Sequence, residues 1–107
     1  MKVVNRRSGA LVWEGSAAEL AEAITSGVDF RGADLRGVDL RCADLADADL
    51  RGADLRYAIL SGADLRCADL RRAILNGAIL DGAILDGSLL DGSLLDGLRH
   101  PRPGHKN

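Results

Sequence analysis

The side chains that could perform chemistry are few, and they do not assemble into a catalytic set. Ser61, Ser88 and Ser93 have no histidine partner near them in the sequence that could activate a hydroxyl as a nucleophile. The glycines recur at regular intervals instead of opening a helix, so the sequence contains no loop of the kind that cradles a phosphate. We therefore predict that the protein is not an enzyme.

Metal and disulfide chemistry is equally sparse. Cys42 and Cys67 lack the short spacings of a metal site, and the aspartates lack the glycine-rich nonapeptide of calcium-binding β-rolls. His100 and His105 lie near the end of the sequence, where a weak adventitious metal site is the alternative. We predict no resident metal, no cofactor and two cysteines in a reducing compartment.

Charge balance excludes several classes of protein. The 107 residues include 14 basic and 16 acidic side chains, for a net charge of -2. This composition argues against a simple basic nucleic-acid binder and against a disordered acidic chain. No uncharged stretch is long enough to span a membrane, and no hydrophobic run follows the basic residues near Met1 as in a secretory signal. We expect one soluble, cytoplasmic domain without membrane contact.

The elements that must position these side chains are set by a period of five. Residues 28–97 divide into fourteen consecutive pentads without insertion or deletion. The third position is Phe30 and thereafter always leucine, the first is small, and the fifth is glycine in nine pentads. A core ladder is therefore predicted from the third positions: Phe30, Leu35, Leu40, Leu45, Leu50, Leu55, Leu60, Leu65, Leu70, Leu75, Leu80 and Leu85.

Only a chain that turns once per pentad can keep these side chains together. In an α-helix they would spread around the cylinder, and in a straight strand they would alternate between faces. Glycine at the fifth position suits a type II turn, which needs a positive φ. Successive circuits would then stack at about 4.8 Å, as strands do in a sheet.

The pattern A-D-L-x-x, as in Ala33-Asp34-Leu35-Arg36-Gly37 and in residues 53–57, resembles the pentapeptide repeat family over residues 28–97. The resemblance implies an all-β solenoid: a right-handed quadrilateral β-helix with four pentads per coil, here about three and a half coils. Residue n would then lie over residue n+20. Cys42 and Cys67 would lie on adjacent sides, too far apart for a disulfide.

Residues 1–27 precede the repeat and predict an N-terminal cap made of a β-hairpin and a short α-helix. Two apolar runs, around Val3 and around Val12, flank a turn at residues 7–9. Ser16 and Glu19 form a capping-box pattern, and the apolar spacing of Ala17, Leu20, Ala21 and Ile24 follows, with Gly27 at the expected helix end. Trp13 and Phe30 would fill the lid. A peptide-binding groove at the cap is the alternative.

At the other end no lid is evident, and residues 98–107 predict a flexible basic tail. The core around Leu80, Leu85, Leu90 and Leu95 would face water. Five aliphatic residues also replace the outward aspartates there, and exposed apolar surface usually marks an interface. The candidate interface residues are Ile74, Ile79, Ile84, Leu89, Leu94, Leu90 and Leu95. Exterior filler, or burial under the tail, is the alternative.

Aspartates at the second position and arginines at the fourth dominate the early pentads. Residues 28–72 carry nine Asp and eight Arg, whereas residues 73–97 carry four Asp and no Arg. We interpret the early charges as solvated columns that compensate each other, with an electrostatic docking face as the alternative.

These observations predict a non-enzymatic protein-interaction or scaffold module. Family members that dimerise do so through their C-terminal ends, so the resemblance implies a homodimer through the last coil, with another protein as a further possible partner. The alternative function is a DNA-mimicking binder or modulator of type II topoisomerase such as DNA gyrase. The early arginines count against such mimicry, and the three basic residues of the tail make direct nucleic-acid binding a weak expectation.

Overall fold

Each pentad in residues 28–97 ends in a turn. Its fifth residue has a φ between 57 and 74° in all fourteen pentads, which is the left-handed region. The next amide donates back to the carbonyl of the third residue, as from Ala33 to Phe30 at 3.1 Å. The turn predicted from glycine at this position is therefore confirmed. The computed structural model describes residues 1–97, and the predicted tail lies outside this range.

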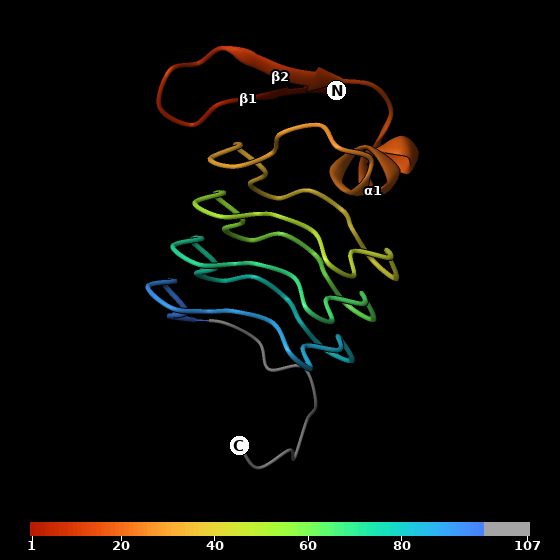
Figure 1. The fold of residues 1–107 in the computed structure, drawn as a ribbon, viewed down its shortest axis with the longest axis vertical. Coiled ribbons are helices and arrows are strands. Elements are labelled where there is room, and N and C mark those ends of the chain that lie inside the picture. Colours follow the sequence, from red (N-terminus) through yellow and green to blue (C-terminus); the bar gives the residue numbers. More distant parts are fainter. Residues whose placement is uncertain (98–107) are drawn as a thin grey trace.

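Backbone pairing joins each residue n to residue n+20. Asp34 pairs in parallel with Asp54, Asp54 with Ile74, and Ile74 with Leu94. Hydrogen bonds of 2.7–3.0 Å hold these contacts, for example from the Leu35 amide to the Asp54 carbonyl. Because twenty residues contain four pentads, each circuit of the chain makes four turns, and the circuits stack as coils (Figure 1).

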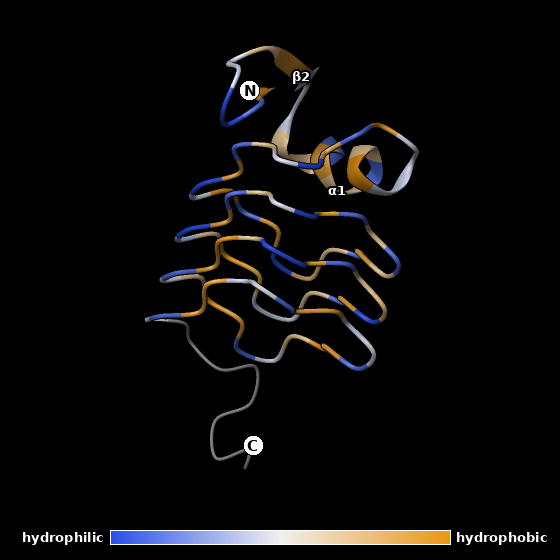
Figure 2. Cartoon of the chain, turned by 60° about the vertical axis from the view of Figure 1, so that its left-hand side comes forward, coloured by the Kyte–Doolittle hydropathy of each residue, from blue (hydrophilic) through white to orange (hydrophobic). Residues whose placement is uncertain are grey.

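We number the four sides of the solenoid by the third-position residues that each contains. Side 1 contains residues 30, 50, 70 and 90, and side 2 contains residues 35, 55, 75 and 95. Side 3 contains residues 40, 60 and 80, and side 4 contains residues 45, 65 and 85. Phe30 and the leucines from Leu35 to Leu80 are at most 2% exposed, whereas Leu85 is only partly buried. Apolar and polar segments alternate around every coil (Figure 2).

A hairpin precedes the first coil. Strand β1 (Lys2–Val4) pairs antiparallel with strand β2 (Leu11–Glu14), and the register shifts between Val3 and Val4. The side chain of Asn5 accepts hydrogen bonds from the amides of Arg7 and Ser8, which fixes the turn. The hairpin then joins side 2, where the Asp34 amide donates to the Val4 carbonyl at 2.7 Å.

Helix α1 (Ala17–Thr25) begins at the predicted capping box. The Glu19 carboxylate accepts hydrogen bonds from both the amide and the hydroxyl of Ser16, at 3.0 and 2.9 Å. The helix ends before Gly27, whose φ is 101°.

The buried face of α1 differs from the predicted one. Leu20, Ala23 and Ile24 are buried, whereas Ala17 is exposed and Ala21 is partly buried. The prediction was wrong for Ala17, which lines a groove beside Leu40 and Arg41 of the first coil instead of joining the core. Trp13 packs against Phe30, with ring centroids 6.3 Å apart.

Five of the fourteen turn positions hold residues other than glycine: Cys42, Asp47, Tyr57, Cys67 and Arg72. These side chains accept a backbone conformation that costs roughly 1–2 kcal/mol outside glycine. Four of them lie over a glycine of the next coil, where an added Cβ would come within 3.3 Å of the side chain above: Cys42, Tyr57, Cys67 and Arg72. Asp47 lies over Cys67.

The pair of Tyr57 and Gly77 allows this steric conflict between stacked turns to be measured. A Cβ at Gly77 would lie 2.5 Å from the Tyr57 ring, whereas a Cβ at Gly82 would meet only the backbone of Gly62 at 3.7 Å. We expect Gly77→Ala to destabilise the protein more than Gly82→Ala, by about 0.5–1.5 kcal/mol, because the exposed ring must also move. Urea unfolding measures the difference, which should vanish in a Tyr57→Gly background. Equal losses with Tyr57 present would contradict this account.

Candidate interaction surface at the terminal coil

We call the last full circuit of the described chain, residues 78–97, the terminal coil. Its four outward second positions are all aliphatic, with one on each side: Ile79, Ile84, Leu89 and Leu94. Ile74 lies one coil earlier on side 2, directly paired with Leu94. These second-position residues surround the solenoid near the end of the described chain. We name them the apolar ring: Ile74, Ile79, Ile84, Leu89 and Leu94.

Exposure rises toward the end of the terminal coil. Ile84, Leu89 and Leu94 are 42, 47 and 55% exposed, whereas Ile74 and Ile79 are partly buried. The core positions follow the same trend, since Leu90 is partly buried and Leu95 is 39% exposed. The terminal coil thus presents both an apolar rim and the edge of the hydrophobic core.

An acidic ring accompanies the apolar ring. The fourth positions of the terminal coil are Asp81, Asp86, Asp91 and Asp96, again one on each side. Asp86 lies close enough to Arg66, and Asp91 to Arg71, to stabilise the charged form of each guanidinium. The remaining acidic charge makes this end of the described chain the most negative part of the repeat.

The early charges are paired within pentads. In seven pentads the arginine Nε and Nη2 atoms donate to the two carboxylate oxygens of the aspartate two residues earlier, and the arginine amide donates to Oδ1. The pairs are 29/31, 34/36, 39/41, 49/51, 54/56, 64/66 and 69/71. The compensation between the Asp and Arg columns that the sequence predicted is confirmed, and the D-L-R spacing of two sets the bidentate geometry.

Asp54 is the most enclosed member of these pairs. Its side chain is 5% exposed, compared with 60% for that of Asp29. Burial raises the pKa of Asp54, but the hydrogen bonds from Arg56 outweigh burial, so that the net pKa is lowered. Arg36 Nε also lies 3.9 Å from Asp54 and links two coils. These contacts brace the wall of the solenoid and leave the aspartate carboxylates little capacity for a ligand.

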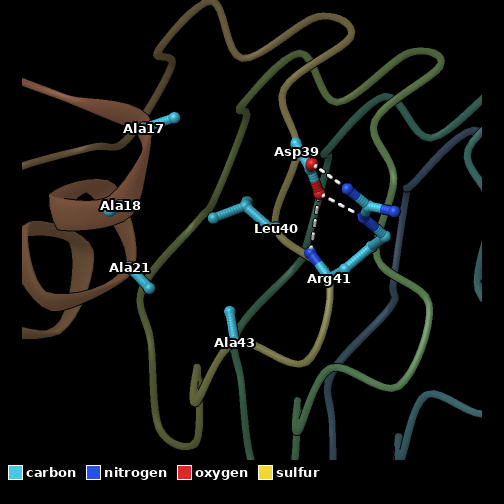
Figure 3. Close-up of a pocket in the computed structure, with 7 residues that line it drawn as sticks. All are labelled: Ala17, Ala18, Ala21, Asp39, Leu40, Arg41 and Ala43. Atoms are coloured by element: carbon cyan, nitrogen blue, oxygen red, sulfur yellow. Dashed lines mark hydrogen bonds and ion pairs between the residues drawn. The ribbon is translucent and has the colours of Figure 1, made fainter.

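A shallow groove separates α1 from the first coils (Figure 3). Its lining residues are Ala17, Ala18, Ala21, Asp39, Leu40, Arg41 and Ala43. The only charged side chains there, Asp39 and Arg41, bind each other through their paired hydrogen bonds (Figure 3). The groove therefore offers small apolar surface but no acid, base or nucleophile that is free to react.

The remaining candidates for chemistry stay apart. Cys42 and Cys67 are free and exposed on sides 3 and 4. Within residues 1–97, no group of three or more His, Cys, Asp or Glu side chains is arranged to hold a metal ion. His100 and His105 lie outside the described residues. Across the same range, no helix has both the length and the apolar character needed to cross a bilayer.

Solved structures provide relatives of this chain. It is 31% identical to the pentapeptide repeat protein Rfr23 from the cyanobacterium Cyanothece 51142, over 60% of this chain and 55% of Rfr23, with a TM-score of 0.42. It is 40% identical to HetL from Nostoc sp. strain PCC 7120, a pentapeptide repeat protein involved in heterocyst differentiation regulation. That match covers 59% of this chain and 34% of HetL, with a TM-score of 0.45. The chain therefore spans about half of Rfr23 and a third of HetL.

No curated protein matches the chain. The profile of the pentapeptide repeats, by contrast, matches residues 16–52 and 48–87 with eight copies of the motif. This match covers most of the turning pentads and confirms the resemblance seen in their sequence. The chain accordingly belongs to the pentapeptide repeat family, whose members fold as right-handed quadrilateral β-helices.

Proposed function

We propose that this protein is a non-enzymatic interaction module that self-associates through its terminal coil. The observation that carries the proposal is the exposure of the apolar ring beside the uncovered core position Leu95. Exposed aliphatic side chains on adjacent sides of one coil form a continuous apolar rim, and such surface usually marks a contact with another protein.

The N-terminal end of the solenoid also supports association through the terminal coil. We infer that the hairpin and α1 act as a lid on the first of about three and a half coils, because they bury Leu20 and Ile24 against the same core as Phe30. Solenoids need such covers, since an open end exposes both core and unpaired backbone. With one end covered in this way, the terminal coil is the more available end for association.

The charge pattern favours this proposal over mimicry of DNA. Each arginine of the seven D-L-R pentads neutralises an aspartate, which leaves the early coils nearly neutral. A surface that replaces DNA in an electrostatic site must be acidic along its whole length. Among the described coils, only the terminal coil carries aspartates without any arginine.

Self-association is tested by sedimentation equilibrium from low to high micromolar concentration. We expect a concentration-dependent dimer for the natural sequence, and about tenfold or more weaker association for the Ile84→Asp, Leu94→Asp double variant, because it places buried charge in an apolar contact. Leu11→Asp is the matched control, since Leu11 is 59% exposed on the hairpin. A strict monomer across the whole range would exclude the proposal.

Capture from a lysate tests whether another protein binds the apolar ring. If a second protein binds this surface, the Ile79→Asp, Ile84→Asp variant should lose it while Leu11→Asp retains it. Retention by both variants would mean that the apolar ring is not the binding surface.

A further inference from the structure

An arginine-lined depression lies on side 1, at the corner where the chain turns toward side 2, and we call it the side 1 depression. Its volume is about 560 Å³, and its lining residues are Asp29, Arg31, Arg51, Gly52, Arg71 and Arg72. Four of these residues carry a guanidinium, and Asp29 carries the only carboxylate among them. The lining therefore offers many more side-chain hydrogen-bond donors than acceptors.

Stacking of the coils brings three of these arginines together. Arg31, Arg51 and Arg71 occupy the fourth position of side 1 in successive coils. The Gly32 amide donates to the Arg51 carbonyl at 2.9 Å, and the coils are therefore separated by the ordinary strand spacing of about 4.8 Å. No other side of the repeat has more than two arginines at this position. Side 1 thus presents the longest column of guanidiniums in the repeat.

Arg72 and Arg6 extend the positive surface at this corner. Arg72 is exposed and lies at a turn with a φ of 64°, a conformation that glycine adopts with less strain. It forms no ion pair with any residue from 1 to 97. Arg6, which follows β1, donates from Nε to the Gly52 carbonyl at 2.8 Å. A fifth guanidinium therefore borders the depression.

The ion pairs of side 1 leave most of the guanidinium N–H groups available. An arginine side chain has five N–H groups, and its bidentate bond to an aspartate uses one on Nε and one on Nη2. Within residues 1–97, the Nη1 atoms of Arg31, Arg51 and Arg71 have no acceptor. The aspartates thus hold each guanidinium in place while its remaining N–H groups can donate to a ligand.

Attraction at this site is local, because side 1 as a whole is close to neutral. Its four arginines are matched by four aspartates, at residues 29, 49, 69 and 91, and Arg6 adds one positive charge. Asp49 accepts hydrogen bonds from Arg51 and raises the pKa of Arg51, whereas the like charge of Arg31 opposes that rise. An anion bound between two such guanidiniums would remove their repulsion.

We propose that the side 1 depression binds anions built from linked phosphate groups, such as a triphosphate chain. Guanidinium N–H groups match the geometry of phosphate oxygens and form charge-assisted hydrogen bonds with them. A phosphate chain repeats its negative groups at short, regular intervals, as the arginines repeat along side 1. Neighbouring phosphates can therefore bind arginines of adjacent coils. The site lies on the wall of the solenoid, so this inference does not depend on the proposed self-association.

The phosphate chain is the part of the ligand that this site would recognise. No aromatic side chain lines the depression, so a nucleoside attached to the chain has no ring on which its base would stack. An inorganic phosphate chain and a nucleoside triphosphate are therefore expected to bind with similar affinity.

Isothermal titration calorimetry with inorganic triphosphate tests the proposal. Divalent cations are left out because they would neutralise the probe, and the salt concentration is about 0.1 M, where charges more than about 10 Å apart are largely screened. We expect one binding site per chain with a Kd in the micromolar range. Inorganic phosphate should bind about tenfold more weakly or less, because a single phosphate group cannot bridge the coils in the same way.

Two matched double variants locate the binding. Arg31→Gln with Arg51→Gln removes two stacked arginines from side 1, and the affinity for inorganic triphosphate should fall by about tenfold or more. Arg36→Gln with Arg56→Gln removes two stacked arginines from side 2, which are also paired with aspartates, and the affinity should change by less than about threefold. Circular dichroism checks that both variants fold.

Arg72→Gln tests the site without removing an ion pair between described residues. It should weaken the binding of inorganic triphosphate by about threefold, because one of the lining guanidiniums is lost. A loss of affinity in this variant and in the side 1 double variant, with little change in the side 2 variant, supports the proposal.

Four results would overturn it. The first is no binding of inorganic triphosphate by the natural protein, and the second is equal weakening by the two double variants, which would indicate a diffuse attraction between charges. The third is inorganic phosphate binding as tightly as the chain. ATP is the second probe and should bind within about threefold of inorganic triphosphate. The fourth result is binding of ATP alone, which would mean that the nucleoside is recognised instead.

Discussion

Leu55→Asp is expected to unfold the protein. Leu55 is 0% exposed and lies on side 2 between Leu35 and Leu75, in a column that contains only apolar core positions. A carboxylate there has no basic partner within the core, and burying an unpaired charge costs several kcal/mol. Domains of this size are stable by only about 5–15 kcal/mol, so one such change removes much of the total.

A graded series checks this expectation by urea unfolding followed by circular dichroism. Leu55→Ala should cost about 3–5 kcal/mol through the cavity that it leaves. Leu95→Asp is the control in the same column, and because Leu95 is 39% exposed, its loss should stay below about 1 kcal/mol in dilute protein. Equal losses at Leu55 and Leu95 would show that the third positions do not form a common core.

Acid is expected to destabilise the protein steeply between about pH 4 and pH 2. Side-chain and backbone hydrogen bonds from Arg31 lower the pKa of Asp29 to about 2, and hydrogen bonds from their own arginines lower the pKa of Asp39 and Asp64. Asp34, Asp49, Asp54 and Asp69 shift in the same direction. A folded-state pKa below the unfolded value means that this stability is complete above about pH 4 and is lost as pH falls through the folded pKa.

The thermal midpoint, measured by circular dichroism from pH 7 to pH 2, should be nearly flat above pH 5 and then fall. The Arg36→Gln, Arg56→Gln double variant removes the arginines of two pairs. Its thermal midpoint should therefore fall less between pH 5 and pH 2 than that of the natural protein. Arg72→Gln is the matched control, because Arg72 forms no ion pair with any described residue. A midpoint that stays constant down to pH 2 would mean that the pairs add no pH-dependent stability.

The repeat made much of this architecture predictable from sequence. A five-residue period with leucine at its centre has one solution that keeps the leucines together, and the family resemblance supplied four sides. Pairing of n with n+20 followed from these two facts, and it also places the late aliphatics on different sides. Ile74 and Leu94 share side 2 because they are twenty residues apart.

Other features depend on geometry that a linear pattern does not contain. The bidentate bond between Asp54 and Arg56 requires the intervening Leu55 to point inward, which brings its two neighbours onto the same outer face. The buried side of α1 depends on how the hairpin sets the helix against the first coil. Spacing alone therefore favoured Ala17 where the structure buries Ala23.

The pairing rule has a consequence for the height of this molecule. Contacts between coils depend on the position of a residue within its pentad, and the third position is leucine from residue 35 onward. Removing or duplicating one interior pentad would rotate everything beyond it by a quarter turn and leave both terminal surfaces chemically unchanged. Length is therefore a separable property of this architecture, adjustable in steps of five residues without redesign of either extremity.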